Sequence, residues 1–159
     1  MTINTENLRI EQVAFDSATA KELIEELQEE YVARYGGRDE TPVDPKQFAP
    51  PSGGFLMVFV GREPVGCAGL RKHNQQSVEV KRMFIRRPFR GRGLSRWLLA
   101  RVEEHGRLLG YDRILMETGV QQPEAMRLYE TSGYEPIPGF GYYAQAAQNR
   151  CYAKELTGG

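Results

Sequence analysis

The sequence has little of what secreted, membrane-spanning and metal-binding proteins need. It contains only two cysteines, Cys67 and Cys151, and no Cys-x-x-Cys pair. It also has no His-Glu-x-x-His motif, and His73 and His105 share no ligand spacing, so no metal site is expected. No apolar run approaches the length of a membrane span, and the N-terminus lacks the features of a signal peptide. These absences favour a cytoplasmic protein with reduced cysteines, each packed as a small apolar side chain.

The chain also lacks any excess of charge. Its 159 residues include 21 Lys and Arg and 21 Asp and Glu, with 40% hydrophobic residues. This composition and length predict a single domain over residues 1–159, with residues 157–159 as a disordered tail. A neutral chain is not expected to attract polyanions as a whole, so a local group of basic residues is informative.

Such a basic group surrounds a glycine turn. Eight Lys or Arg residues and no Asp or Glu lie between Lys81 and Arg101. Within this stretch, residues 90–95 (Arg-Gly-Arg-Gly-Leu-Ser) separate the apolar run 83–85 from a helical pattern that begins at Leu94. A helix N-terminus has free backbone N–H groups and a positive dipole end, and glycines let a ligand approach the backbone closely. The stretch therefore predicts a site for a phosphate-bearing ligand.

Hydrophobic periodicity predicts the order of the remaining elements. Strands are expected at residues 8–15, 55–60, 64–72, 78–86, 114–117 and 151–156. Helices are expected from a cap at Asp16 or Ser17 to Gly36, from Leu94 to Gly110, and at residues 124–131. Short turns join the second, third and fourth strands, so these should be antiparallel, whereas the strands around the second helix should be parallel. The pattern predicts an α/β fold with a mixed, mostly antiparallel sheet and helices on both faces.

Other phosphate-binding and nucleophile motifs are absent. A Gly-x-Gly-x-x-Gly motif would need glycine where Arg96 stands, and no Gly-x-x-x-x-Gly-Lys-Ser/Thr sequence occurs. Nothing resembling Gly-x-Ser-x-Gly marks a nucleophilic serine.

Two segments carry a family resemblance. Residues 80–94 resemble the acetyl-CoA signature of the GNAT superfamily of N-acetyltransferases, Gln/Arg-x-x-Gly-x-Gly/Ala after a strand. Arg90 and Gly93 match this signature, and Ser95 replaces its last small residue. Residues 123–134 resemble the family's Asn-x-x-Ala-x-x-Leu-Tyr-x-x-x-Gly-Phe/Tyr helix, with Gln122 near the usual Asn. The resemblance covers about residues 55–156 and implies a sheet splayed at its parallel strand pair.

The same resemblance implies transfer of an acetyl group from acetyl-CoA to a primary amine, by direct attack in a ternary complex. The backbone of the run 83–85 should bind pantetheine and polarise the thioester carbonyl. The amides of residues 91–96 should hold the pyrophosphate, with Arg90 and Arg92 adding charge. The implied cofactor contacts are Met83, Phe84, Ile85, Arg90, Gly91, Arg92, Gly93, Leu94, Ser95, Arg96 and Gln122.

Two residues are candidates for proton transfer. Tyr129 matches the family's tyrosine that protonates the departing thiolate, and the alternative is a packed core tyrosine. Glu79 stands where some members carry a general base, eleven residues before Arg90. The alternatives for Glu79 are an ion pair with Arg71 or Lys81, and His73 or water as the base.

Strict alternation along the strand expected at residues 78–86 would place Glu79, Lys81 and Met83 on one face. It would place Val78, Val80 and Arg82 on the other face.

The acceptor is the least determined part of the prediction. Residues 39–54 and 139–149 form long loops that could border the acceptor site or only cover the surface. Tyr142, Tyr143 and Glu117 could contact a cationic acceptor. A small-molecule amine is favoured, but an amino acid, a peptide N-terminus and a lysine stay open, as does a homodimer. The rival functions are a non-catalytic CoA-binding module and, less favoured, contact with nucleic acid through the basic group.

Overall fold

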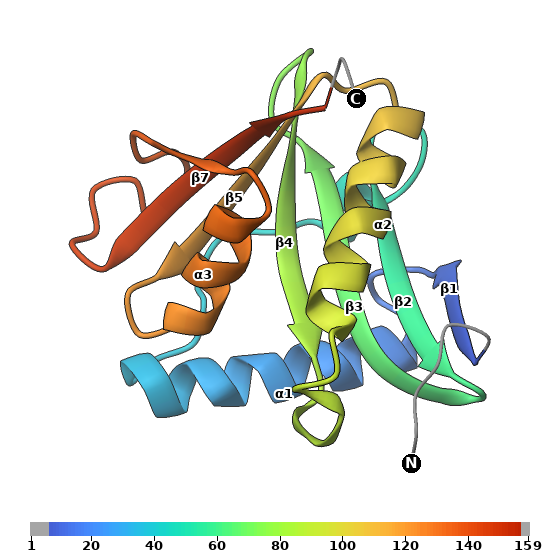
Figure 1. Ribbon diagram of the computed structural model, residues 1–159. Coiled ribbons are helices and arrows are strands. Elements are labelled where there is room, and N and C mark those ends of the chain that lie inside the picture. The colour runs from blue at the N-terminus through green and yellow to red at the C-terminus, as the bar shows by residue number, and fades with distance from the viewer. Residues whose placement is uncertain (1–6, 157–159) are drawn as a thin grey trace.

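The computed structural model describes residues 7–156, which form one seven-stranded sheet with helices on both faces (Figure 1). The strands, in the spatial order β1-β2-β3-β4-β5-β7-β6, are β1 (Leu8–Gln12), β2 (Gly54–Val60), β3 (Glu63–Lys72), β4 (Ser77–Ile85), β5 (Arg113–Gly119), β7 (Asn149–Glu155) and β6 (Glu135–Ile137). The helices are α1 (Ala18–Tyr35), α2 (Leu94–Leu108) and α3 (Pro123–Thr131), with the 3-10 helices η1 (Pro45–Phe48) and η2 (Arg87–Phe89). Only β4 and β5 pair in parallel within this sheet, which confirms the predicted mixed fold.

Local sequence signals explain where α1 begins and ends. Ser17 is its N-cap, and the Ser17 side chain accepts a hydrogen bond from the backbone N–H of Ala20. Gly36 ends the helix in the left-handed conformation, with φ of 79°. The helix reaches from one end of the sheet to the splayed end of β5, where it closes one side of the site described below (Figure 1).

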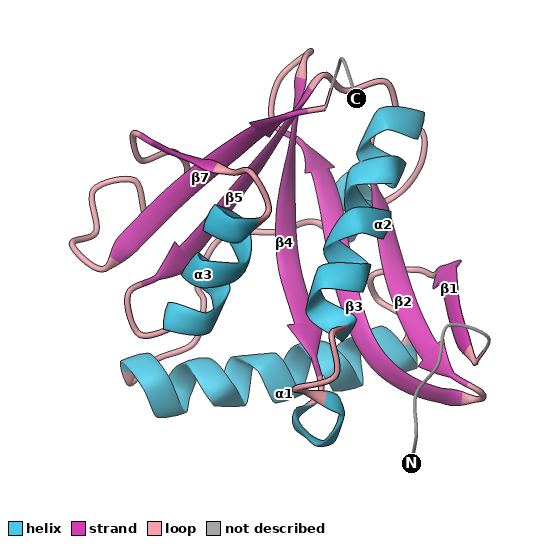
Figure 2. Cartoon of the chain, viewed as in Figure 1, coloured by secondary structure: helices cyan, strands magenta, loops and turns pink. Residues whose placement is uncertain are grey.

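The helices divide the interior into two cores. Helix α1 and η1 pack on one face of the sheet, and α2 and α3 pack on the other (Figure 2). Phe48 of η1 is 1% exposed and stacks on Phe15 at a centroid distance of 4.5 Å. The Phe48 ring also lies over Gly69, where an added Cβ would come within 2.8 Å of it. Phe48 therefore anchors the loop over residues 39–54 on the sheet.

The parallel pair separates soon after it begins. β4 and β5 pair only over Ser77–Glu79 and Arg113–Leu115. Beyond these positions the two strands diverge, and Figure 1 shows the widening gap between them. The backbone of β4 stays paired with β3 up to Ile85, so its other edge is left without a strand partner there. This is the splay that the family resemblance implies.

A β-bulge in β4 corrects the expected alternation of side chains. Cys67 faces Phe84 and Gly69 faces Lys81, so Ala68 alone lies opposite both Arg82 and Met83. Arg82 takes a left-handed φ of 59°, which moves its side chain to the face of Lys81. Its guanidinium pairs there with Asp39, to which Lys81 also points.

Met83 consequently packs with the core under α2 and α3. The expectation that Met83 shares a face with Glu79 is therefore wrong, because the extra residue shifts the period of two after Lys81.

Other predicted boundaries differ modestly from the structure. β1 ends at Gln12 rather than Phe15, β4 ends at Ile85 because Arg87 and Pro88 begin η2, and the short edge strand β6 has no periodic signal in the sequence. The predicted tail at residues 157–159 lies outside the described residues.

Both cysteines are buried and free. No described helix has the length and apolar character needed to cross a membrane. The described residues also contain no cluster of His, Cys, Asp or Glu placed to bind a metal.

Candidate active site

Two cavities meet in the gap between β4 and β5. The first, of about 500 Å³, is bounded by the C-terminal part of α1, the two strands and the loop before β7. The second, of about 380 Å³, lies between the end of β4, the glycine turn and α3. Met83, Gln122, Ala125 and Tyr129 line both cavities. A ligand in one cavity can therefore reach a ligand in the other at these four residues.

The glycine turn forms one end of the second cavity. Gly91 and Gly93 have φ of 78° and 80°, and an added Cβ at either residue would meet nothing within 4 Å. Gly93 is also the N-cap of α2, where no side chain caps the free N–H groups. The turn thus combines open space with unpaired helix N–H donors, which suits a phosphate group. The predicted contacts that line this cavity are Met83, Phe84, Ile85, Arg90, Gly91, Gly93, Leu94, Ser95, Arg96 and Gln122. Arg92 is not among its lining residues.

The arginines of the turn have protein partners. Arg90 binds Glu30 of α1 through both terminal nitrogens, at 2.7 and 3.2 Å, and its Nε donates to the carbonyl of Ile85 at 2.8 Å. Arg96 donates to the hydroxyls of Thr131 and Ser132 at the end of α3. Arg90 therefore ties the turn to α1 and β4 in addition to lining the cavity.

Tyr129 stands where the two cavities join. It is 7% exposed, and its ring lies 5.7 Å from the rings of both Tyr134 and Tyr152. Burial, and to a smaller degree the neighbouring Tyr152, raises the pKa of Tyr129 to about 12. The phenol therefore keeps its proton at neutral pH and is available as a donor.

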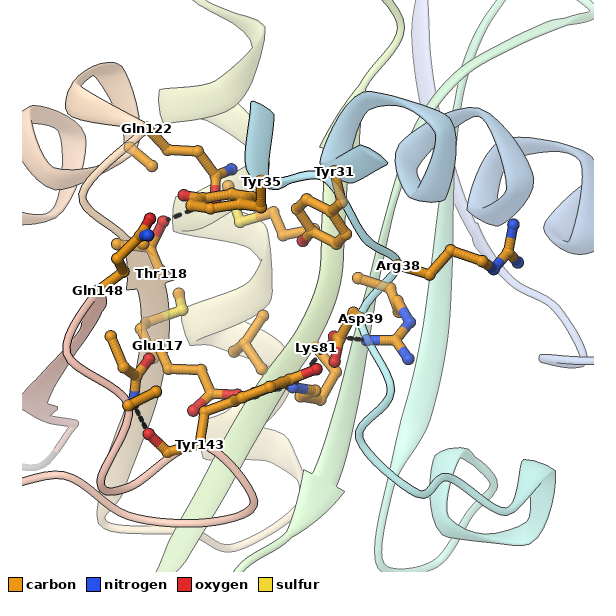
Figure 3. Close-up of a pocket in the computed structure, with 18 of the residues that line it drawn as sticks. Tyr31, Tyr35, Arg38, Asp39, Lys81, Glu117, Thr118, Gln122, Tyr143 and Gln148 are labelled. Carbon is orange, nitrogen blue, oxygen red and sulfur yellow. Dashed lines mark hydrogen bonds and ion pairs between the residues drawn. The ribbon is translucent and has the colours of Figure 1, made fainter. Parts of the chain in front are cut away.

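A buried ion-pair network borders the first cavity (Figure 3). The Lys81 Nζ atom lies 2.9 Å from Glu117 Oε1, 3.6 Å from Asp39 Oδ2 and 4.0 Å from Glu79 Oε2. Arg82 binds the same Asp39 oxygen. The side chain of Lys81 is only 3% exposed, so these contacts are screened weakly by water. Lys81 joins the loop after α1 to β4 and β5.

The pKa of Asp39 reflects two opposing effects. Burial acts to raise it, but Lys81 and Arg82 favour the carboxylate and hold the pKa below its ordinary value of 3.8. Asp39 therefore stays ionised at neutral pH and holds the two cations in place.

The predicted bases lie in different positions. Glu79 is 5% exposed and binds Arg71 Nε at 2.9 Å, and it does not line either cavity. His73 is exposed in the turn before β4, with its ring edge-on to Phe140 at 5.4 Å. Glu117 lines the first cavity directly. The sequence suggested it as a contact for a cationic acceptor and not as a base.

The remaining wall of the first cavity comes from α1 and the loop before β7. Tyr31 and Tyr35 project from α1, and the Tyr35 hydroxyl donates to Gln122 Oε1 at 3.1 Å. Tyr143 accepts a hydrogen bond from the backbone N–H of Glu40 at 2.8 Å, which joins the loop after α1 to the loop before β7. Tyr142 is 54% exposed and is not part of the lining.

Comparison with known proteins agrees with this geometry. Residues 20–134 match the model of the acetyltransferase (GNAT) family. The chain belongs to the GNAT family. It is an N-acetyltransferase, and acetyl-CoA is its acetyl donor.

Individual GNAT relatives are similar over most of the chain. An IAA acetyltransferase of Azospirillum brasilense is 33% identical over 77% of this chain and 80% of its own length. N-acetylaspartate synthetase of Rattus norvegicus is 26% identical over 74% of this chain but only 40% of its own length. The crystal structure of a putative acyl-CoA N-acyltransferase from Klebsiella pneumoniae has a TM-score of 0.79 and 25% identity, covering 94% of this chain and 97% of that one.

A GNAT acetyltransferase of Elizabethkingia anophelis, crystallised with acetyl-CoA bound, is similar in fold. Its TM-score is 0.69 and its identity 15%, and the match covers 95% of this chain and 99% of that chain.

Sequence reasoning missed several residues of the GNAT cavity. Tyr31 and Tyr35 have the spacing of apolar helix positions, and this spacing does not distinguish a core side chain from a cavity wall. Asp39 is the first residue of the proline-rich loop, which could border the acceptor site. This position is the only signal in the sequence that points to Asp39. Lys81 was assigned to the correct face of β4 but given no role beyond pairing with Glu79.

Proposed function

We propose that this GNAT enzyme acetylates a primary amine by direct attack on acetyl-CoA, with both substrates bound at once. The observation that carries the proposal is the junction of two unlike cavities at Tyr129 and Met83. One cavity ends at a helix N-terminus with open glycines, and the other is bordered by a buried ion-pair network. The first kind of site suits phosphates, and the second suits a charged acceptor.

The donor would lie along the open edge of β4. Beyond Glu79 this edge has no pairing to β5, so those backbone groups of the run 83–85 that point to the open edge would bind the pantetheine amides. A backbone N–H from this run would polarise the thioester carbonyl where negative charge develops. The amides of residues 91–96 would hold the pyrophosphate, and Arg90 would fix the turn through Glu30 while adding positive charge.

Tyr129 would give its proton to the departing thiolate. Its raised pKa makes the phenol a weaker acid, but the same buried environment also disfavours the thiolate that would receive the proton. The new C–N bond forms as the C–S bond breaks, and Tyr129 regains a proton from the acylated nitrogen. No activated protein nucleophile is needed for this sequence.

Glu79 would take part in deprotonating the amine only through water. It lies behind Lys81 and is bound to Arg71, so an acceptor in the cavity would not contact it directly. We therefore propose a supporting role for Glu79, in which it helps to hold Lys81.

The phosphate site can be tested with Gly93→Ala. A residue with a side chain at φ of 80° is strained by about 1–2 kcal/mol, and its Cβ would also enter the space left for the pyrophosphate. We expect acetyl-CoA to bind at least tenfold more weakly, measured by calorimetry. Gly110→Ala is the matched control, because Gly110 has φ of 94°, equally open surroundings and no place in either cavity. Equal acetyl-CoA affinity in the two variants would contradict the proposed phosphate site.

Turnover is tested by thiol release from acetyl-CoA with a panel of amines. The proposed function predicts release that depends on both acetyl-CoA and an amine, without an acetylated enzyme that can be isolated. Binding of acetyl-CoA with no release for any amine would favour the rival function, a non-catalytic CoA-binding module. The names of the relatives point to different acceptors. The acceptor of this protein therefore has to be inferred from the residues of its own cavity.

A further inference from the structure

We infer that Glu117 receives and deprotonates the acceptor's ammonium group, and that the acceptor is a small primary amine that carries no carboxylate. This inference rests on the proposed function and adds to it a residue and a substrate class. It starts from Glu117 itself, which β5 places on the wall of the first cavity, across the splay from Lys81 (Figure 3).

The two oxygens of Glu117 differ in their partners. Oε1 accepts a hydrogen bond from Lys81 Nζ at 2.9 Å, whereas Oε2 is buried and has no hydrogen-bond partner among the described residues. The Glu117 side chain is only 9% exposed. A buried carboxylate oxygen without a donor is unfavourable, and an ammonium group has three donors to satisfy it. An amine in the cavity would therefore complete the hydrogen bonding of Glu117.

The charges around the cavity favour a ligand with a single positive charge. Every cation on its wall already has a carboxylate partner: Lys81 has Glu117 and Asp39, Arg82 has Asp39, and Arg38 has Glu25. A carboxylate on the ligand would have to compete with these internal partners and would lie close to Asp39 and Glu117. The Nε atom of Arg82 has no partner in the described part of the chain, so this charged N–H is free to donate to an oxygen of a ligand that reaches it.

The rest of the wall suits a compact organic body. Tyrosines 31, 35 and 143 and the apolar side chains of Val80, Met83 and Met116 surround the charged end. A cavity of about 500 Å³, with the contact between Tyr143 and Glu40 beside it, has room for a small molecule. We therefore favour a small amine with an uncharged body over a lysine that is part of a folded protein.

The proton balance assigns a separate acceptor to each proton that leaves the nitrogen. The ammonium gives one proton to Glu117, which leaves a neutral amine able to attack the thioester carbonyl. After the C–N bond forms and the C–S bond breaks, the nitrogen gives a second proton through Tyr129 to the thiolate. The amide keeps the third proton, and Glu117 then releases its own proton to water.

Lys81 acts as a positioning residue in this scheme. It fixes one oxygen of Glu117 and leaves the other without a hydrogen-bond partner among the described residues, and Asp39 and Glu79 hold Lys81 from other sides. Glu79 and Glu117 both contact Lys81. Glu79, however, is already paired with Arg71, and Glu79 does not line the cavity. These contacts favour Glu117 over Glu79 as the group that meets the amine.

The test compares Glu117→Gln and Glu79→Gln in the full chain with two matched pairs of acceptors. Tyramine and tyrosine differ only by a carboxylate, as do 2-phenylethylamine and phenylalanine. We expect wild-type kcat/KM to be at least tenfold higher for the amines without a carboxylate. Glu117→Gln should lower kcat/KM for tyramine about a hundredfold, with acetyl-CoA affinity unchanged. Its rate should keep rising with pH as the free amine forms, whereas the wild-type rate reaches a plateau.

Glu103→Gln is the matched control for removing a buried carboxylate. Glu103 binds Lys154 and Tyr134, is 8% exposed, and lines neither cavity. The inference is overturned if Glu117→Gln turns over tyramine like wild type, if Glu79→Gln alone causes the loss, or if the amino acids are preferred. It is also overturned if the wild-type protein binds acetyl-CoA but neither of the two amines without a carboxylate reacts. Failure to bind acetyl-CoA would instead overturn the proposed function.

Discussion

Lys81→Met is expected to lower the free energy of unfolding by about 3–5 kcal/mol, the usual cost of removing one partner from a buried ion pair. Lys81 is 3% exposed at its side chain and contacts carboxylates from Asp39, Glu79 and Glu117. Methionine fills a similar volume, so little of the loss would come from a cavity. The loss would come from like charges that are left close together with little water to separate them. Urea unfolding at neutral pH measures the difference.

The control for this variant is Lys72→Met. Lys72 is exposed at the end of the neighbouring strand β3, and its replacement should change the stability by less than about 0.5 kcal/mol. A second substitution, Glu117→Gln, should restore part of the stability of Lys81→Met because it removes one uncompensated charge. Lys81→Met with wild-type stability would show that the network contributes nothing to the fold.

The pH dependence of this effect has a definite sign. The pKa of Asp39 is below its ordinary value in the folded protein, so Asp39 contributes stability above pH 3.8 that is lost as the pH falls through its folded pKa. In Lys81→Met much of this contribution is absent at every pH. The difference between wild type and variant should therefore be largest near neutral pH and should shrink below about pH 4, as carboxylates become protonated. Urea unfolding repeated at several pH values would show this.

Tyr129→Phe is expected to lower kcat about a thousandfold, within the range for a lost general acid. The hydroxyl is the only atom removed, and the ring would keep its contacts with Tyr134 and Tyr152. The departing thiolate would then have to take its proton from water in a buried cleft. Acetyl-CoA affinity should change little, because the proposed donor contacts come mainly from the β4 backbone and the glycine turn. Single-turnover thiol release separates this chemical step from binding.

Tyr152→Phe is the control for Tyr129→Phe. Tyr152 lies beside Tyr129 in the same aromatic group, its hydroxyl donates to Glu130 at 3.2 Å, and it lines neither cavity. We expect it to keep wild-type turnover. Unchanged thiol release in Tyr129→Phe would remove the acid role and leave Tyr129 as a core residue that shapes the junction.

Much of the fold follows from local signals in the sequence. Ser17, Gly36 and the glycine turn mark helix ends by chemistry that acts within a few residues, and these boundaries are confirmed. The parallel pair follows from the strand–helix–strand order, because a crossover connection imposes it. The bulge at Arg82 could not be predicted, since one extra residue leaves no mark in the hydrophobic pattern. The bulge has a large effect, because Arg82 and Met83 each lie on the face of the sheet opposite to the one that strict alternation predicts.

Local sequence motifs mark only the side of the candidate site that we propose for the donor. The glycine turn and the run 83–85 are contiguous in sequence, so a local motif marks them. The acceptor side is assembled from Asp39, Lys81 and Glu117, which are distant in sequence and meet only when the sheet is formed. No local pattern shows that one oxygen of Glu117 would have no partner among residues 7–156.

The position of α1 has a consequence for how the two substrates influence each other's binding. Glu30 holds Arg90 beside the second cavity, which we propose binds the donor, and its neighbour Tyr31 lines the first cavity on the same helix. Any shift of α1 that follows donor binding beside Arg90 would therefore also move Tyr31 in the wall of the first cavity. Occupancy of one site and affinity of the other are then thermodynamically coupled, and the coupling is reciprocal. Kinetics with both substrates varied should show that each changes the apparent affinity for the other.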